Sequence, residues 1–402
     1  MIELVKESEY CSGCSACMAA CVKNAIKMET DSEGFLYPKI SEACNNCGMC
    51  AKACPHNNKN VKSEFNKALY AGISNDDKIW KESSSGGAFS EICNAYGDSD
   101  TVIFGAAFDG LYVAHKYVVG IDNISEFRKS KYVQSDMKNC YREAIGFLKE
   151  GKKVLFSGTP CQIKGLKSFL KLSKLNELYN DNLLCVDFIC HGVGSPKVFW
   201  RYTEYLSKKY NSKLIRYSFR NKKYIRGRLQ TFCSVYEFEN KKNICNPDCI
   251  YVKTFIQKLS HRPSCGNACV GCGEDRASDI TIADCKDKAL VPRNDNKNYS
   301  TLIFNSEKGF YLLDALKNSM YLALDEFSNI RKFNFQFYEH SEHNKNREPF
   351  FKELDSGASV EKLLLKYYIK PKFSLYIALL GLIPENIKNI LKKVIKRSEN
   401  EA

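Results

Sequence analysis

Two cysteine runs decide the N-terminal fold, CSGCSACMAAC at residues 11–21 and CNNCGMCAKACP at residues 44–55. Both have the spacing C-x2-C-x2-C-x3-C, and together they hold eight of the 20 cysteines in this chain of 402 residues. Two intervening residues let a turning backbone point successive sulfur atoms at one bound group while its N–H groups donate to that group. So many regularly spaced thiols predict metal ligation rather than ordinary packing.

The spacing is that of bacterial ferredoxins with two 4Fe-4S clusters, in which the fourth Cys of each run ligates the other cluster. This crossover predicts two ligand sets. The first set is Cys11, Cys14, Cys17 and Cys54. The second set is Cys44, Cys47, Cys50 and Cys21. A zinc ribbon or a group of buried thiols is the alternative, but zinc needs four ligands rather than two runs of four.

The composition is that of a globular protein, because 44% of the residues are hydrophobic and 26% are charged, which excludes a disordered chain. Residues 1–10 carry acidic side chains where a signal peptide would have an apolar core. Free thiols in such numbers also suit a reducing compartment, so we expect a cytoplasmic protein. The net charge of +14 fits nucleic acid, anionic lipid or an acidic partner, or it offsets negatively charged clusters.

Beyond residue 60 the sequence alternates between strand-like and helical segments, which predicts a mixed α/β body. Strands are expected at 101–109 and 112–120, a helix at 139–151, and two strand-to-helix units at 152–171 and 182–210. Pro160 and Pro196 suit first helical turns, and Ser195 suits an N-cap.

Cysteines also occur where these two units pass from strand to helix, which is where α/β proteins place ligand sites. Cys161 lies in SGTPCQ at 157–162, and Cys190 precedes His191 in ICHGVGSP at 189–196. We interpret His191 on its own as a core residue. Three further cysteines, with metal-like spacing but no fourth ligand nearby, are Cys265, Cys269 and Cys272. Cys161 or Cys190 could complete a third 4Fe-4S cluster, and a zinc site is the alternative.

KESSSGGAFS at 81–90 places hydroxyls and two glycines before a helical segment. Small residues let a backbone approach a ligand closely, and a helix N-terminus favours phosphate oxygens. An ordinary Ser N-cap would give the same pattern, so this segment is a weak signal by itself.

Taken together, these segments resemble the coenzyme F420 hydrogenase/dehydrogenase beta-subunit family, in the branch with an N-terminal two-cluster ferredoxin domain. The resemblance rests on SSSGGAFS at 83–90, SKYVQSD at 130–136, LFSGTPCQIKGLKSFL at 155–170, ICHGVGSPKVFW at 189–200, RPSC at 262–265 and SDITIADC at 278–285. It implies an FAD-binding body with its own 4Fe-4S cluster. Such a protein passes electrons between clusters and a hydride carrier such as the deazaflavin coenzyme F420.

The resemblance also implies site residues. Those expected to contact the flavin are Ser84, Ser85, Gly86, Gly87, Tyr132, Gln134, Ser135 and Thr159. Those expected to hold the third cluster are Cys161, Cys190, Cys265 and either Cys269 or Cys272. The family usually has just two Cys after RPS, so the extra one leaves one ligand open. No protein acid or base is required for hydride transfer, and none is predicted.

We therefore expect an α+β protein in four parts: a ferredoxin-type domain at 1–60, flavin contacts at 61–150, the third cluster and flavin at 151–340, and a basic helical tail at 341–402. Its expected function is that of an iron–sulfur flavoprotein oxidoreductase with a redox partner protein and a hydride-carrying small molecule. A non-catalytic electron-transfer adapter is the alternative. No nucleic acid is expected, and packing of the tail on the core is preferred to membrane contact. The remaining cysteines are interpreted as ordinary thiols: Cys93, Cys140, Cys185, Cys233, Cys245, Cys249 and Cys285.

Overall fold

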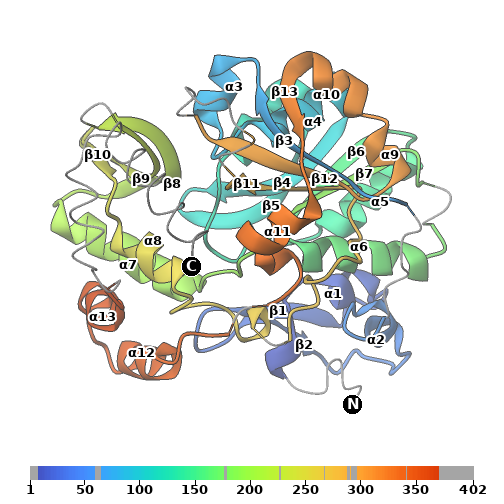
Figure 1. Cartoon of the computed structure of the whole chain (residues 1–402). Coiled ribbons are helices and arrows are strands. Elements are labelled where there is room, and N and C mark those ends of the chain that lie inside the picture. The colour runs from blue at the N-terminus through green and yellow to red at the C-terminus, as the bar shows by residue number, and fades with distance from the viewer. Residues whose placement is uncertain are drawn as a thin grey trace, which may run out of the picture.

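The N-terminal region contains two short helices and one hairpin, and it lies below the body in Figure 1. The computed structural model describes residues 8–58, 65–175, 179–225, 228–266, 268–287, 290, 297–340 and 342–370. The N-terminal elements are α1 (Ala16–Ala20), β1 (Ile26–Thr30), β2 (Leu36–Ile40) and α2 (Met49–Ala53), after the 3-10 turn η1 (Ser8–Tyr10). The two strands pair antiparallel. Gly34 turns the hairpin with φ +92°, and an added Cβ would lie 2.5 Å from Cβ of Lys197.

An eight-stranded mixed sheet forms the centre of the body, in the order β13-β3-β12-β11-β7-β6-β4-β5. Its strands are β3 (Ala68–Ser74), β4 (Val102–Asp109), β5 (Tyr112–Val119), β6 (Val154–Ser157), β7 (Leu183–Phe188), β11 (Ile280–Cys285), β12 (Tyr299–Phe304) and β13 (Met320–Leu324). The four strands β4, β6, β7 and β11 are parallel, and antiparallel strands flank them. The body is therefore mixed α/β, as the alternating sequence pattern predicted.

Helices cover both faces of this sheet (Figure 1). The helices of the body are α3 (Asp77–Glu82), α4 (Ala88–Tyr96), α5 (Cys140–Lys149), α6 (Pro160–Leu172), α7 (Pro196–Lys209), α8 (Ile250–Ile256), α9 (Glu307–Phe310), α10 (Leu313–Ser319) and α11 (Phe327–Phe333), and three 3-10 turns are η2 (Ile121–Phe127), η3 (Pro263–Cys265) and η5 (Phe335–Phe337). Ser195 caps α7 and accepts from Val198 N, and Pro196 takes its first turn, as expected.

The N-terminal region shares a hydrophobic core with the body. Ala16, Ala19 and Ala53 pack in the same buried cluster as Phe156 and Ile163. Small side chains on α1 and α2 let these helices approach α6 closely, so the N-terminal cysteines are held against the body.

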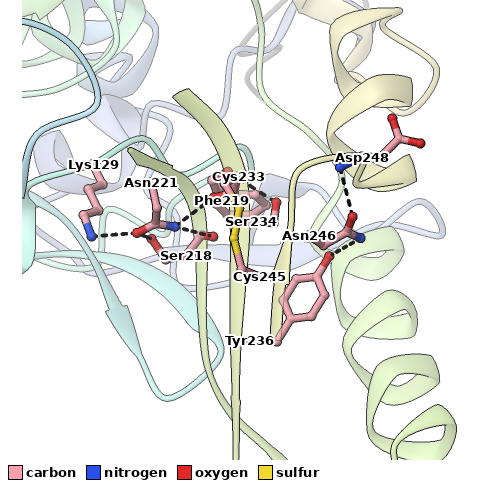
Figure 2. Close-up of a disulfide and its surroundings, with 10 residues drawn as sticks. All are labelled: Lys129, Ser218, Phe219, Asn221, Cys233, Ser234, Tyr236, Cys245, Asn246 and Asp248. Carbon is pink, nitrogen blue, oxygen red and sulfur yellow. Dashed lines mark hydrogen bonds between the residues drawn. A yellow bond between two sulfur atoms is a disulfide. The ribbon is translucent and has the colours of Figure 1, made fainter. Parts of the chain in front are cut away.

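A separate three-stranded sheet corrects one prediction. It contains β8 (Leu214–Ile225), β9 (Arg228–Phe238) and β10 (Asn243–Asn246) in the order β10-β9-β8. Cys233 and Cys245, predicted to be ordinary thiols, form a disulfide between β9 and β10 (Figure 2). The two residues are 12 positions apart, and the β9–β10 pairing places their Cα atoms 6.2 Å apart, within reach of a disulfide.

The C-terminal part contains α12 (Arg347–Asp355) and α13 (Val360–Tyr367), which pack beside α7 and α8. The predicted tail helix beyond residue 370 lies outside the described residues. None of the helices in the described residues combines the length and the hydropathy of a membrane span.

Candidate functional site

Four N-terminal cysteines line one small cavity, which we call the inner cavity. They are Cys11, Cys14, Cys17 and Cys54, and the cavity is closed by Met28, Pro38, Pro55 and His56 among others. The structure thus brings together the four thiols that the crossover pattern grouped. Gly13 N donates to Cys11 Sγ at 3.4 Å, which is the kind of backbone contact that stabilises a thiolate.

The other N-terminal set lies nearer the surface. Cys47 is exposed and Cys44 is partly exposed, whereas Cys50 is buried. Burial raises the pKa of Cys50, and the nearby Cys44 and Cys47 raise it further. Backbone N–H groups donate to two of the sulfurs, from Asn46 to Cys44 at 3.4 Å and from Ala25 to Cys21 at 3.3 Å.

Burial decides the ionisation of the inner thiols. Desolvation raises the pKa of Cys14, Cys17 and Cys54 above the ordinary thiol value, and their mutual repulsion adds to this effect. Thiolates in such a place need a positive partner. A metal bound to them would supply this charge and would release their protons on binding.

A second cavity, the five-cysteine cavity, lies where β6 and β7 end. It is lined by Cys161, Cys190, Cys265, Cys269 and Cys272. Cys161 begins α6 directly after β6, and Cys190 follows β7, so two parallel neighbours deliver them to one edge of the sheet. The other three come from the segment before β11. Lys258 also lines this cavity. His191 lines it as well and is exposed, so its interpretation as a core residue was wrong.

Hydrogen bonds fix the Cys161 side of the five-cysteine cavity. Thr159 Oγ1 lies 3.0 Å from Cys161 Sγ, and Gln162 closes a capping box with Thr159. Gln162 also donates to Ser135 Oγ at 3.2 Å, and Ser135 Oγ lies 2.9 Å from Nδ1 of His115. Burial lowers the pKa of His115 to about 4, so this chain of contacts ends on a neutral imidazole.

Cys272 is placed differently from the other four thiols. Its Sγ lies 3.7 Å from the carbonyl oxygen of Gln336. Its thiol also donates toward Cys269, which lowers the pKa of Cys269 below the ordinary thiol value. Within the described part of the chain, no three or more His, Cys, Asp or Glu side chains are arranged to hold a single metal ion.

The residues expected at the flavin fall into two places. Gln134, Ser135 and Thr159 line the five-cysteine cavity. Ser84 lies apart from them: its Oγ accepts from Ser130 N at 2.9 Å, and its carbonyl accepts from Arg220 at 3.1 Å.

Tyr132, another residue expected at the flavin, stacks on Phe255 with ring centroids 4.4 Å apart. Burial raises the pKa of Tyr132, and the positive charge of Arg220 offsets part of this rise. Arg220 therefore lies beside both Tyr132 and Ser84.

The glycine segment at the start of α4 packs against the protein's own strands. A Cβ on Gly86 would lie 2.3 Å from Gly72 O and 2.5 Å from Ser300 N. Ser85 Oγ donates to the carbonyl of Tyr299 at 2.5 Å. Gly87 begins α4 with φ +99°, which a residue with a side chain rarely adopts. The small residues at 85–87 are thus required by the junction with β3 and β12.

Sequence reasoning missed two residues of the site. Ser12 lines both the inner cavity and the five-cysteine cavity, so the two cavities are neighbours. Arg262, within the RPSC motif, donates from Nε to Cys11 O at 2.7 Å. The motif marks Arg262 in the sequence, but only the folded chain shows what it contacts.

Known families account for both halves of this site. Residues 151–330 match the model for the C-terminal region of the beta subunit of coenzyme F420 hydrogenase/dehydrogenase. Residues 10–58 match the 4Fe-4S dicluster domain. No curated protein matches the sequence. Among solved structures, a chain of the F420-reducing [NiFe] hydrogenase complex from Methanosarcina barkeri is 14% identical, with a TM-score of 0.45, over 73% of this chain and 94% of that one.

The family recognised from the sequence is therefore confirmed. Residues 151–330 of this chain match the C-terminal region of the coenzyme F420 hydrogenase/dehydrogenase beta subunit, and residues 10–58 match a 4Fe-4S dicluster domain.

Proposed function

We propose that this family member is an iron–sulfur flavoprotein that passes electrons between 4Fe-4S clusters and a hydride carrier. The observation that carries the proposal is the adjacency of two thiol-lined cavities, which share Ser12 as a wall. Electrons tunnel between clusters only over short distances, so neighbouring clusters make a conductive path. Cys47 is exposed, which gives the outer end of that path access to a partner protein.

The dicluster domain supplies two clusters in this proposal. Cys11, Cys14, Cys17 and Cys54 hold the inner cluster. Cys44, Cys47, Cys50 and Cys21 hold the outer one.

A third cluster in the five-cysteine cavity takes Cys161, Cys190, Cys265 and Cys269 as its ligands. Every pair within this group interacts electrostatically in at least one direction, which fits four ligands around one cluster. Cys272 is left outside this group: its single S–H is directed at Cys269, and its Sγ lies 3.7 Å from Gln336 O. Thiols spaced around a cavity suit a four-iron cluster better than a single zinc ion, whose ligands converge on one point.

The region around Arg220 fits the polar part of FAD. Asn298 Oδ1 and Arg220 Nε are buried and have no hydrogen-bond partner among the described residues. Lys222 lies beside them and donates to Ser85 O at 2.5 Å. The unpaired N–H of Arg220 and the Lys222 ammonium suit a pyrophosphate group, whereas the Asn298 oxygen would accept from a donor group of the cofactor.

The other residues expected at the flavin, Gln134, Ser135 and Thr159, line the five-cysteine cavity and would hold the flavin beside the third cluster. When bound, a flavin exchanges either one or two electrons, which lets it connect one-electron clusters to a two-electron hydride carrier.

Electrons and protons balance in this proposal. Oxidation of one reduced hydride carrier yields two electrons and one proton, and two clusters each accept one electron. The proton leaves to solvent. The residues of this chain bind the cofactors, exclude water and set their potentials, and no side chain is required as an acid or base for the hydride itself.

Anaerobic reconstitution tests the proposal. About twelve iron and twelve sulfide per chain are expected from three clusters, together with bound FAD. About eight iron with one zinc would remove the third cluster. Reduced deazaflavin, NADH, NADPH and reduced ferredoxin, added in turn, should bleach the cluster absorption with at least one of them. A protein that takes up no FAD and oxidises no carrier, yet accepts electrons from ferredoxin, would instead be an electron-transfer adapter.

A further inference from the structure

The buried Arg262 contacts the segment of residues 11–13, in which Ser12 lines both cavities. The Arg262 side chain is 0% exposed. Nε donates to Cys11 O at 2.7 Å and Nη2 donates to Leu36 O at 3.0 Å, both in the N-terminal region. Arg262 also precedes Cys265 of the five-cysteine cavity by three residues, and its own N–H donates to Val193 O.

No carboxylate of the described residues forms an ion pair with this charge. None of the ion pairs formed by the described residues involves Arg262. Its Nη1 is buried and has no hydrogen-bond partner in the same part of the chain. The guanidinium carbon lies 4.0 Å from the ring centre of Tyr37, which is a weak substitute for a counter-ion. Burying a charge without a counter-ion destabilises the folded protein strongly. We therefore expect an anionic group to lie beside Arg262 when the protein is complete.

Thiols on both sides can supply that partner. On one side, the backbone of Gly13 is so close that a Cβ there would lie 3.1 Å from the guanidinium carbon, and Cys11 and Cys14 flank it. On the other side, the same Cβ on Gly13 would lie 2.4 Å from Nε2 of Gln134, which lines the five-cysteine cavity, and Cys265 N donates to Arg262 O at 3.0 Å. Four thiolates make a 4Fe-4S cluster negative overall, and each added electron makes it more so. A fixed cation near two such clusters stabilises the reduced state of both.

We propose that Arg262 is a shared counter-ion of the inner cluster and the third cluster, and that it raises the reduction potentials of both. This inference rests on the proposed function, because it needs both clusters. Arg262 donates to backbone oxygens and ligates no cluster. It therefore acts on the clusters through its charge and through the backbone segments that it holds in place. The outer cluster, held by another set of thiols, provides a reference within the same molecule.

Arg262→Gln and Arg262→Lys test the proposal in the reconstituted full chain. Redox titration followed by electron paramagnetic resonance gives the potential of each cluster. In R262Q the inner and third clusters should become harder to reduce, by at least tenfold in the equilibrium constant, which is about 59 mV for one electron. The outer cluster should keep its potential. R262K keeps the charge without the planar fork, so its potentials should fall less than those of R262Q.

Arg142→Gln is the matched control. Arg142 on α5 also clamps the N-terminal backbone, donating to Ala19 O at 2.9 Å and to Cys21 O at 2.6 Å, but it does not line the five-cysteine cavity. R142Q should leave the third cluster unchanged.

The outcomes separate the two proposals. Three clusters in the wild type with unshifted inner and third potentials in R262Q would overturn the counter-ion role alone. Absence of the third cluster from the wild type would overturn the proposed function. If R262Q loses its clusters, R262K decides through its pH dependence. Inner and third potentials that fall when the pH is raised enough to deprotonate the buried lysine, beside an unchanged outer potential, support the role, and potentials that follow the wild type at every pH overturn it.

Discussion

The dicluster region and the five-cysteine cavity both gather thiols, but they do so in different ways. In the first, all eight cysteines lie between residues 11 and 54, and their spacing in sequence already groups them. In the second, the thiols come from the start of α6, the end of β7 and the segment before β11. A local motif carries its geometry within itself, whereas the second site exists only if the parallel sheet forms. The first should therefore tolerate changes in the body that abolish the second.

Cys161→Ser should produce the largest effect, because it removes one ligand of the proposed third cluster. We expect iron to fall from about twelve to about eight per chain, with the two N-terminal clusters retained. Iron and sulfide analysis with electron paramagnetic resonance measures this loss.

Cys272→Ser is the control for that change. Since Cys272 is proposed to donate to Cys269 rather than to bind iron, the variant should keep all three clusters. If C272S loses the third cluster and C269S keeps it, the ligand assignment is reversed.

The buried His115, which lies beside the five-cysteine cavity, should make the free energy of unfolding depend on pH in the acid range. Its pKa is lowered by burial from 6.5 to about 4, so between these values the unfolded chain binds more protons than the folded one. Stability should thus fall as the pH drops from about 6.5 to about 4, by about 3 kcal/mol at most. Denaturant unfolding across this range should show a flatter pH profile for His115→Gln, and equal slopes would contradict the prediction.

The Cys233–Cys245 disulfide should stabilise the small sheet without serving the clusters. It closes a loop of 12 residues, so replacing both cysteines by Ser should lower the free energy of unfolding by about 2–3 kcal/mol. Anaerobic thermal unfolding measures the change. Iron content should stay at the wild-type value, and a loss of iron would show that these cysteines serve the clusters.

A substitution at Gly165 on α6 should test the contact between the dicluster region and the body. A Cβ there would lie 3.1 Å from Cys14 Sγ and 3.0 Å from Tyr141 Oη, so Gly165→Ala should destabilise the protein by about 1–2 kcal/mol. Gly146→Ala on α5 is the matched control. Apart from its own helix, no atom of the described residues lies within 4 Å of a Cβ there, so this helical substitution should be neutral or stabilising by about 0.5–1 kcal/mol. Equal effects in chemical denaturation would exclude the contact.

Several elements could be predicted because their causes are local. Pro160 and Pro196 fix helix starts, and the alternating pattern predicts β4 and β5 within a residue or two. The disulfide could not be predicted, because it depends on the register of β9 with β10. The glycines at 86 and 87 suggested a ligand loop, yet their closest neighbours include residues of β3 and β12, which are distant in sequence.

The sequence by itself identified the family and predicted the dicluster ligand sets, since both are written in short motifs whose chemistry needs fixed spacing. Only the tertiary structure decided that Ser12 separates two neighbouring cavities and that Cys272 turns toward Gln336. The position of Arg262 belongs to the second group as well. A buried cation is defined by what surrounds it, and here its surroundings come from residues 11, 36 and 193, which only folding brings together.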